Sequence, residues 1–215
     1  MNHLTQYYHE RANEYDAIYR KPERQKDIRQ LAALLADQLN HKRVLEVACG
    51  TGFWTQFYGP NSKSVLATDY NQSVLDIAEE RLGSWPHVRL QQADGFTLKG
   101  VEGDFDAGLA AFWWSHLTYA DAQRFLATLH QYLQPGSEVW IADNRYVEGS
   151  SSPICRVDEG GNTYQLRRLS DGREFEVLKN FPDRERFQSW LGERGSDLTF
   201  MEMEYFWLAK YRINE

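Results

Sequence analysis

Residues 43–52 read Arg-Val-Leu-Glu-Val-Ala-Cys-Gly-Thr-Gly, a short apolar run that ends in glycines. Such a run predicts a buried strand, because a strand covered on both faces of a sheet is continuously apolar. The glycines predict a tight turn into a helix, and Gly52 is expected to let the backbone approach a ligand closely. The alternative is a tight strand–helix connection that binds no ligand, and further motifs are needed to distinguish the two.

Strands and helices are predicted to alternate on both sides of this turn. Apolar spacing indicates further strands at residues 64–69, 87–90, 105–111 and 138–143. It indicates helices after Pro22, over 53–58, over 74–82 and from Phe125 to Leu133. Pro135-Gly136 is expected to end the last of these helices. An aromatic stripe of Tyr8, Ala12, Tyr15 and Tyr19 predicts an additional helix at the N-terminus. Alternation of this kind favours a parallel, doubly wound α/β sheet.

The last third of the chain has a different pattern. Two extended runs, residues 163–169 and 174–179, flank Ser-Asp-Gly-Arg and predict a β-hairpin. Asp183 is expected to cap a helix, and residues 200–211 can supply one or two closing strands. We therefore expect one domain over residues 1–215, with a helical extension over 1–40 and a hairpin insertion over 160–181.

The composition restricts the possible partners. The 215 residues carry 24 basic and 31 acidic side chains, a formal charge of −7, which argues against nucleic-acid and anionic-membrane binding. With two cysteines and no long apolar run, we expect a soluble, cytoplasmic protein that is a monomer or homodimer. The six histidines show no metal-ligand spacing, so no metal is expected.

Acidic residues stand at the ends of three successive predicted strands. Glu46 ends the first strand, Asp69 ends the second, and Asp94 follows the third. An acid at the position of Asp69 can accept hydrogen bonds from both ribose hydroxyls of a nucleoside, and Asp94 can accept one from an adenine amino group. Each acid alone is a typical surface or capping residue, and the set of three is what favours a nucleoside site.

The nucleoside is expected to lack phosphates. A dinucleotide fingerprint would place a glycine at position 55, where the chain has Thr55, and a phosphate-binding loop would place a lysine after Gly52, where it has Phe53. A ring of acidic residues suits a cationic cofactor better than a pyrophosphate.

These motifs together resemble the class I S-adenosylmethionine-dependent methyltransferases. Residues 44–52 are similar to motif I of that family, with Ala48 in place of its first glycine. The later motifs are matched in order by Asp69, Ala93-Asp94, Phe105-Asp106 to His116 and Leu133-Gln134-Pro135-Gly136. The resemblance covers roughly residues 5–145. The resemblance implies a three-layer Rossmann-like fold with a seven-stranded sheet of order 3-2-1-4-5-7-6, its last strand antiparallel. It also implies an N-terminal helix that closes over the cofactor as a lid.

The cofactor that this resemblance implies is S-adenosylmethionine (SAM). Its expected contacts are Tyr8, Tyr15, Glu46, Ala48, Cys49, Gly50, Gly52, Asp69, Tyr70, Asp94, Gly95 and Ala111. The lid, residues 1–20, is expected to exchange amide hydrogens quickly without ligand and slowly with it.

The methyl acceptor is expected beyond the fourth strand. His116 is a candidate base or acceptor-orienting group, with a packing role as the alternative. Trp113 and Trp114 are candidates for walls around a flat substrate or for core packing, and Arg145 for holding an acidic substrate or for a surface ion pair. We expect transfer to a small molecule, with oxygen favoured over nitrogen or carbon; a non-catalytic SAM-binding regulator and a methyltransferase for a protein partner are the alternatives.

Overall fold

A computed structural model describes residue 16, residues 18–168 and residues 172–214. Its main sheet has seven strands in the order β3-β2-β1-β4-β5-β10-β9. The strands are β1 (Arg43–Val47), β2 (Ser64–Asp69), β3 (Val88–Gln92), β4 (Phe105–Ala111), β5 (Leu133–Asn144), β9 (Gly195–Glu202) and β10 (Phe206–Ile213). Strand β10 is antiparallel to both of its neighbours, β5 and β9. The expected strand order and the antiparallel last strand are confirmed.

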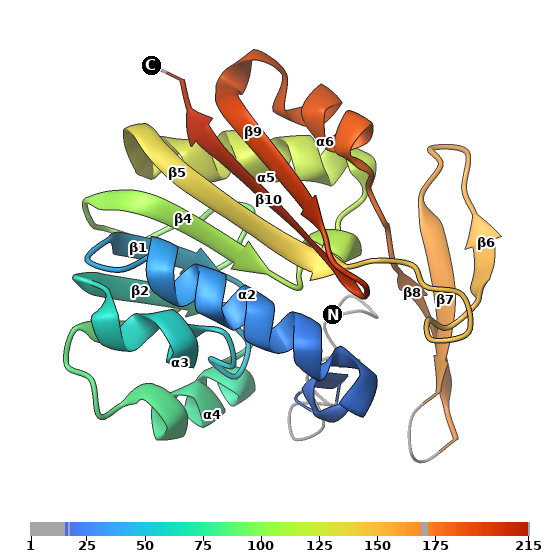
Figure 1. The fold of residues 1–215 in the computed structure, drawn as a ribbon, viewed down its shortest axis with the longest axis horizontal. Helices are drawn as coiled ribbons and strands as arrows, with labels where there is room; N and C mark the ends of the chain where they lie inside the picture. Colours follow the sequence, from blue (N-terminus) through green and yellow to red (C-terminus); the bar gives the residue numbers. More distant parts are fainter. Residues whose placement is uncertain (1–15, 17, 169–171, 215) are drawn as a thin grey trace.

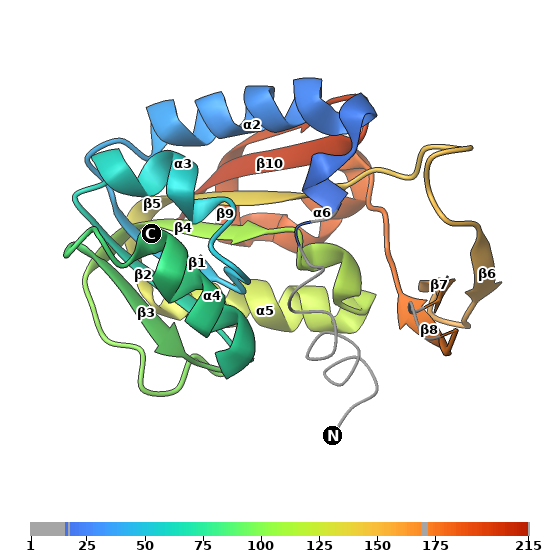
Figure 2. The ribbon, with the colours of Figure 1, turned by 90° about the horizontal axis from the view of Figure 1, so that it is seen from below.

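Helices cover both faces of this sheet, as Figure 2 shows with α2 on one side and α5 on the other. The helices are α2 (Gln25–Gln38), α3 (Thr55–Tyr58), α4 (Gln72–Leu82), α5 (Tyr119–Gln131) and α6 (Arg184–Leu191), and short 3-10 turns are η2 (Pro22–Arg24), η3 (Gly59–Asn61), η4 (Trp114–His116) and η5 (Gly192–Arg194). No helix among the described residues is long and apolar enough to cross a membrane.

The two faces of β1 show why this strand is continuously apolar. Val44 packs in the core that lies under α2, whereas Leu45 and Val47 pack in the core formed with α5 and α6. Successive side chains of a strand point to opposite faces, so Glu46 faces the same side as Val44, where α3 lies. This placement decides the role of Glu46 in the site described below.

A second, three-stranded sheet stands beside the main one, as Figure 1 shows at its right. Its order is β6-β7-β8, with β6 at Ile154–Val157, β7 at Thr163–Arg168 and β8 at Glu174–Leu178. The expected hairpin is therefore present as β7 and β8, and β6 was missed because its four residues are all exposed and show no alternation. Hydrogen bonds from Asn180 Nδ2 to the Leu117 carbonyl at 2.8 Å and from the Tyr119 N–H to Asn162 Oδ1 at 2.9 Å join this small sheet to the main domain.

Several predicted boundaries of helices and strands are wrong. Helix α5 ends at Gln131, and Pro135-Gly136 lies inside β5, which begins at Leu133. Leu133 pairs with Phe105 of β4, and the register shifts between Phe105 and Ala107, so the strand begins earlier than its apolar core suggests. Strand β3 begins one residue later than expected and extends to Gln92.

Candidate active site

The turn after β1 has a left-handed backbone at three of its residues. Ala48, Gly50 and Gly52 have φ values of 58°, 56° and 71°. Glycine adopts this region freely, whereas for alanine it is uncommon and costs strain. Phe112, which follows β4, also has a positive φ of 62°. Strained non-glycine residues thus stand at the carboxyl ends of two adjacent central strands, where such strain is typical of functional sites.

Gly52 is required for helix packing. A Cβ atom at this position would lie 2.6 Å from Cδ1 of Leu82 and 3.4 Å from Cβ of Ala78, both on α4. The missing side chain therefore makes room for α4, and the close approach of a ligand to Gly52 stays a prediction. Its positive φ adds an independent requirement for glycine.

Asp69 ties the end of β2 to this turn. Its Oδ2 accepts a hydrogen bond from the Gly50 N–H at 2.9 Å, and its Oδ1 accepts one from the Asn71 N–H at 2.9 Å. Burial raises the pKa of Asp69, and these backbone bonds partly oppose that rise. A carboxylate offers about four lone-pair sites, so Asp69 retains capacity to accept further hydrogen bonds from ribose hydroxyls.

Glu46 faces the interior instead of the edge of the sheet. Its Oε2 accepts hydrogen bonds from Thr55 Oγ1 at 2.5 Å and from Tyr58 Oη at 2.6 Å, both on α3. Burial raises the pKa of Glu46 to about 7, despite these two bonds. The carboxylate holds α3 against β1, and a direct cofactor contact from it stays a prediction.

The other expected cofactor residues differ in burial and in their protein contacts. Asp94 is exposed, and its Oδ1 accepts the Phe96 N–H at 2.7 Å. A Cβ on Gly95 would lie 2.8 Å from Trp113, so Gly95 makes room for that indole. Cys49 and Ala111 are buried at the ends of β1 and β4, whereas the Tyr70 side chain is exposed. Their contacts with a cofactor stay predictions, and Tyr8 and Tyr15 lie outside the described residues.

The described part of the N-terminal segment packs against the glycine turn. Tyr19 stacks on Phe53, with ring centroids 3.9 Å apart, and meets Phe112 edge-on at 5.5 Å. Asp16 accepts a hydrogen bond from Thr51 Oγ1 at 2.7 Å and forms an ion pair with Arg81 of α4 at 2.5 Å. Arg81 also donates to the Thr51 carbonyl at 2.8 Å, so one arginine connects α4, the turn and the N-terminal segment.

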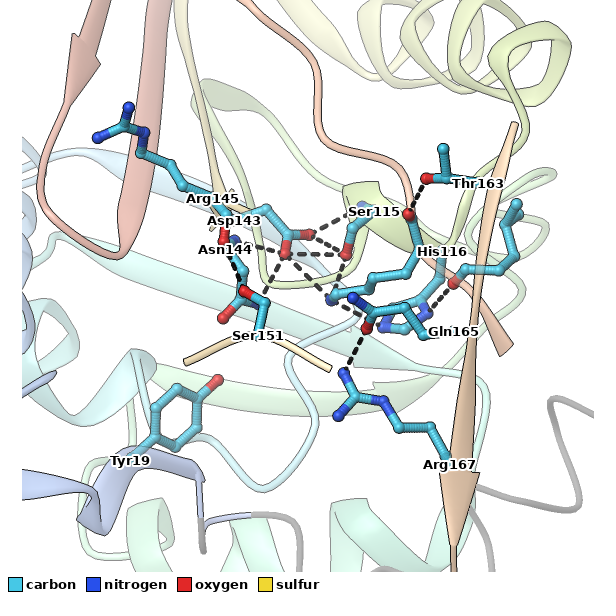
Figure 3. A network of polar contacts seen from close by, with 12 residues as sticks. Tyr19, Ser115, His116, Asp143, Asn144, Arg145, Ser151, Thr163, Gln165 and Arg167 are labelled. Atoms are coloured by element: carbon cyan, nitrogen blue, oxygen red, sulfur yellow. Dashed lines mark hydrogen bonds and ion pairs between the residues drawn. The ribbon is translucent and has the colours of Figure 1, made fainter. Parts of the chain in front are cut away.

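A buried polar network lies past the ends of β4 and β5 (Figure 3). Asp143, at the end of β5, accepts bonds from the Ser115 N–H at 2.8 Å and from Ser115 Oγ at 2.9 Å. Lys179, which follows β8, donates to Ser115 Oγ at 2.5 Å and lies 3.4 Å from Asp143 Oδ1. Burial raises the pKa of Asp143, but the charge of Lys179, together with His116 and the backbone hydrogen bonds from Ser115 and Asn144, lowers it below its ordinary value. This ion pair joins the small sheet to β5.

His116 belongs to this network as a neutral ring. Its Nδ1 lies 3.0 Å from the Leu178 carbonyl, which requires a proton on Nδ1, and its Nε2 lies 3.3 Å from Lys179 Nζ. Burial, followed by the charge of Lys179, lowers the pKa of His116 well below its ordinary value. Both ring nitrogens face protein partners, which suits an orienting group better than a base.

Two expected substrate-wall residues lie elsewhere. Trp114 is buried in the core between Phe125, Phe187 and Trp207, so the core-packing alternative is correct for it. Arg145 forms an ion pair with Glu202 at 3.2 Å and donates to the Met203 carbonyl, and in Figure 3 it points away from the network. The surface ion pair is therefore the correct interpretation for Arg145. Trp113 is half-buried, 4.8 Å from the ring of Phe125 and 5.5 Å from that of Phe96.

Four residues near the ends of β4 and β5, a region called the corner below, were missed from the sequence: Arg24, Asp143, Arg167 and Lys179. Asp143 had a usable signal, because it ends the predicted strand 138–143 as Asp69 ends the predicted strand 64–69. The other three come from η2, β7 and the residue after β8, and no local pattern marks them as neighbours.

Comparisons with known proteins agree with this arrangement. A family described as "Methyltransferase domain" matches residues 44–136. A demethylmenaquinone methyltransferase of Clavibacter sepedonicus is 26% identical over 72% of this chain and 65% of its own length, so the chain spans less than two thirds of that relative.

Solved structures resemble the whole fold. The complex of DhpI with S-adenosylhomocysteine (SAH) is 25% identical, with a TM-score of 0.78 over 97% of this chain and 94% of that one. A complex of DhpI with SAM and HEP has a TM-score of 0.78 at 24% identity, over 99% of each chain. The fold, the family match and these relatives together make the chain similar to the class I S-adenosylmethionine-dependent methyltransferases.

Proposed function

We propose that the protein transfers a methyl group from SAM to an oxygen atom of a small-molecule acceptor. The observation that carries the proposal is the buried Asp69 carboxylate, which is bonded to Gly50 of the glycine turn and retains acceptor capacity at the edge where β1 and β4 end. A carboxylate so placed fits a ribose, and the network of Ser115, His116 and Lys179 lies farther along the same edge.

The residues present fit the cofactor. Asp69 would hold the ribose, the turn from Ala48 to Gly52 would lie along the amino-acid portion, and Asp94 with Gly95 would face the adenine. SAM, when bound, supplies an electrophilic methyl group whose bond electrons remain on sulfur after transfer. The chain's own task is to align the acceptor with that methyl group and to exclude water.

Oxygen is favoured over an amine by the charges near the network. An alkyl amine is a cation at neutral pH, and Arg167 and Lys179 both lie in this corner of the molecule (Figure 3 labels Arg167). Like charges in a buried setting repel strongly. A hydroxyl or an anionic oxygen meets no such repulsion.

His116 is proposed to act as a positioning residue for this reaction. Its Nε2 accepts from Lys179, and its Nδ1–H is directed to Leu178, so the ring fixes the lysine relative to the end of β8. Removing the ring should loosen Lys179 and misplace the acceptor, while SAM binding at β1 and β2 should be unaffected.

The experiment uses methyl-labelled SAM, the purified protein and a fractionated metabolite extract. We expect label to appear in a low-molecular-weight fraction with equimolar SAH. His116→Ala should lower kcat by about 10²-fold with an unchanged Kd for SAH, and His116→Asn should restore part of it. His87→Ala is the matched control, because the His87 ring bonds to the Gly59 carbonyl, and His87 directly precedes β3 at the other side of the sheet. Tight SAM binding without turnover would show a regulator, and label in protein fractions would show a protein acceptor.

A further inference from the structure

Arg24 is a buried arginine whose guanidinium is only partly bonded. It is 5% exposed, and its Nη1 donates to Asn144 Oδ1 at 2.7 Å. Its Nε is buried and has no hydrogen-bond partner. Within the described part of the chain, no carboxylate lies within ion-pair distance of Arg24. An unpaired buried donor on a charged group costs free energy, so it calls for a partner such as a water molecule or an anion.

A second guanidinium lies in the same corner. Arg167 of β7 donates to Ser152 Oγ at 2.9 Å and to Gln165 Oε1 at 2.8 Å, and it has no acidic partner among the described residues. Figure 3 shows its side chain extending from β7 toward the side on which Tyr19 and Ser151 lie. Burial is the main cause that lowers the pKa of Arg24; the charge of Glu23 raises it, and the charge of Arg167 lowers it further.

The charges of this corner do not balance. Asp143 pairs with Lys179 at 3.4 Å, and His116 is neutral, so neither offsets the charges of Arg24 and Arg167. Glu23 acts on Arg24 from beyond ion-pair distance, and its exposed carboxylate pairs with Lys21. This excess occurs in a chain whose formal net charge is −7. Two guanidiniums that have no ion-pair partner among the described residues, held on separate elements by neutral amides and hydroxyls, are typical of a site that receives an anion.

We propose that Arg24 and Arg167 together bind an anionic oxygen group, a carboxylate or a phosphate-type group, on the methyl acceptor. The inference rests on the proposed function. Arg24 donates to Asn144 at the end of β5, two strands away from the glycine turn of β1, or roughly 10 Å at the ordinary strand spacing. An anion bound there would place the remainder of the acceptor over the ends of β4 and β1, where the methyl group is expected. The two guanidiniums would orient the acceptor and favour anionic acceptors over their neutral analogues.

The first test measures binding and requires no turnover. Inorganic phosphate and, separately, acetate are titrated into the protein saturated with SAH, in a buffer of low ionic strength. We expect Arg167→Gln and Arg24→Gln each to weaken phosphate binding by about tenfold or more, with an unchanged affinity for SAH. Trimethyl phosphate, which is neutral, should not bind. The ratio of phosphate to acetate affinity shows which anion the site prefers.

Arg168→Gln is the matched control, because Arg168 is the next residue of β7 and is exposed on the opposite face of that strand. It should change phosphate binding by less than twofold. Equal weakening by Arg168→Gln and Arg167→Gln would show a diffuse surface effect and overturn the proposal. A loss of SAH affinity in the Arg24 or Arg167 variants would show that these residues serve the cofactor's own carboxylate and would also overturn it. Should Arg24→Gln fail to fold, Arg167→Gln still tests the proposal, because Arg167 is half-buried on the small sheet.

The second test measures transfer to paired acceptors: hydroxylated carboxylic and phosphonic acids, and the neutral esters of the same compounds. We expect label only in the acids, and at least a tenfold loss of kcat/KM in Arg167→Gln. Label in the esters at equal rates would overturn the anion site and leave the methyltransferase function standing. Arginine-dependent phosphate binding with no label in any acceptor would have the reverse meaning: the anion site would stand and the proposed function would fail.

Discussion

At the scale of single residues, Asp69 is the side chain on which the cofactor site depends most directly. Asp69→Ala should weaken SAH binding by about 1.5–3 kcal/mol, the usual contribution of hydrogen bonds to a charged group. Titration calorimetry measures this directly. Asp76→Ala is the control, since Asp76 is exposed on the neighbouring helix α4 and accepts only from Gln72. Unaltered affinity in Asp69→Ala would refute the ribose assignment.

Gly52 illustrates a residue whose requirement comes from packing. Gly52→Ala should destabilise the fold by more than the roughly 1–2 kcal/mol of a left-handed alanine, because the new Cβ also meets Leu82 at 2.6 Å. Gly136 has a similar positive φ, 77°, with no atom within 4 Å of a new Cβ, so Gly136→Ala should show the backbone cost alone. Urea unfolding of both variants checks the difference. Equal losses would mean that α4 shifts freely.

Glu46 makes the stability of the protein depend on pH. Its folded-state pKa of about 7 lies above the ordinary 4.5, chiefly because the carboxyl is buried. The folded protein therefore holds a proton that the unfolded chain loses between these values. The stabilising contribution is complete below pH 4.5 and is lost as the pH rises through 7.

Glu46→Gln removes this titration while keeping an oxygen for Thr55 and Tyr58 to bond. Relative to the variant, the wild type should lose roughly 2–4 kcal/mol of unfolding free energy between pH 4.5 and pH 8. Chemical unfolding at a series of pH values measures both proteins. A constant difference across that range would show that Glu46 stays ionised in the fold.

At the scale of elements, Arg81 connects helix α4 to the N-terminal segment through Asp16 and Thr51. If residues 1–20 close over the cofactor, Arg81→Gln should reduce the protection that SAH gives to them in hydrogen-exchange mass spectrometry. Arg89→Gln, at an exposed position on β3, should leave the protection unchanged. Equal protection with and without SAH in the wild type would show a permanent structural segment.

The small sheet shows how an element that looked peripheral in the sequence becomes part of the site. Residues 163–169 and 174–179 predicted a hairpin, and the structure confirms β7 and β8. Their role depends on Asn180 and Lys179, which attach the sheet to Leu117 and Asp143 of the main domain. Attachment of this kind lets β7 present Arg167 near the end of β5.

At the scale of the whole molecule, the strand order was implied by the resemblance to the class I methyltransferases, whereas the parallel, doubly wound sheet and the edge of the expected site could be predicted from residues 43–52 and the strand–helix alternation around them. The reason is that burial on both faces of a parallel strand and the glycine turn that follows are local requirements, visible within ten residues. The position of Asp69 at that edge follows from the same alternation, since the carboxyl ends of parallel strands lie together.

Side-chain partners were decided only by tertiary packing. Arg24 and Asn144 are 120 positions apart and share a hydrogen bond, and Lys179 meets Ser115 across 64 positions. Trp113 and Trp114 are adjacent in sequence, yet one lies beside Gly95 and the other lies deep in the core under α6. Local periodicity specifies which face of an element is buried, but it contains no information on which distant charge will meet that face. The grouping of Arg24, Arg167 and Lys179 therefore arises from the fold, because the docking of η2 and the small sheet near the end of β5 brings these residues together.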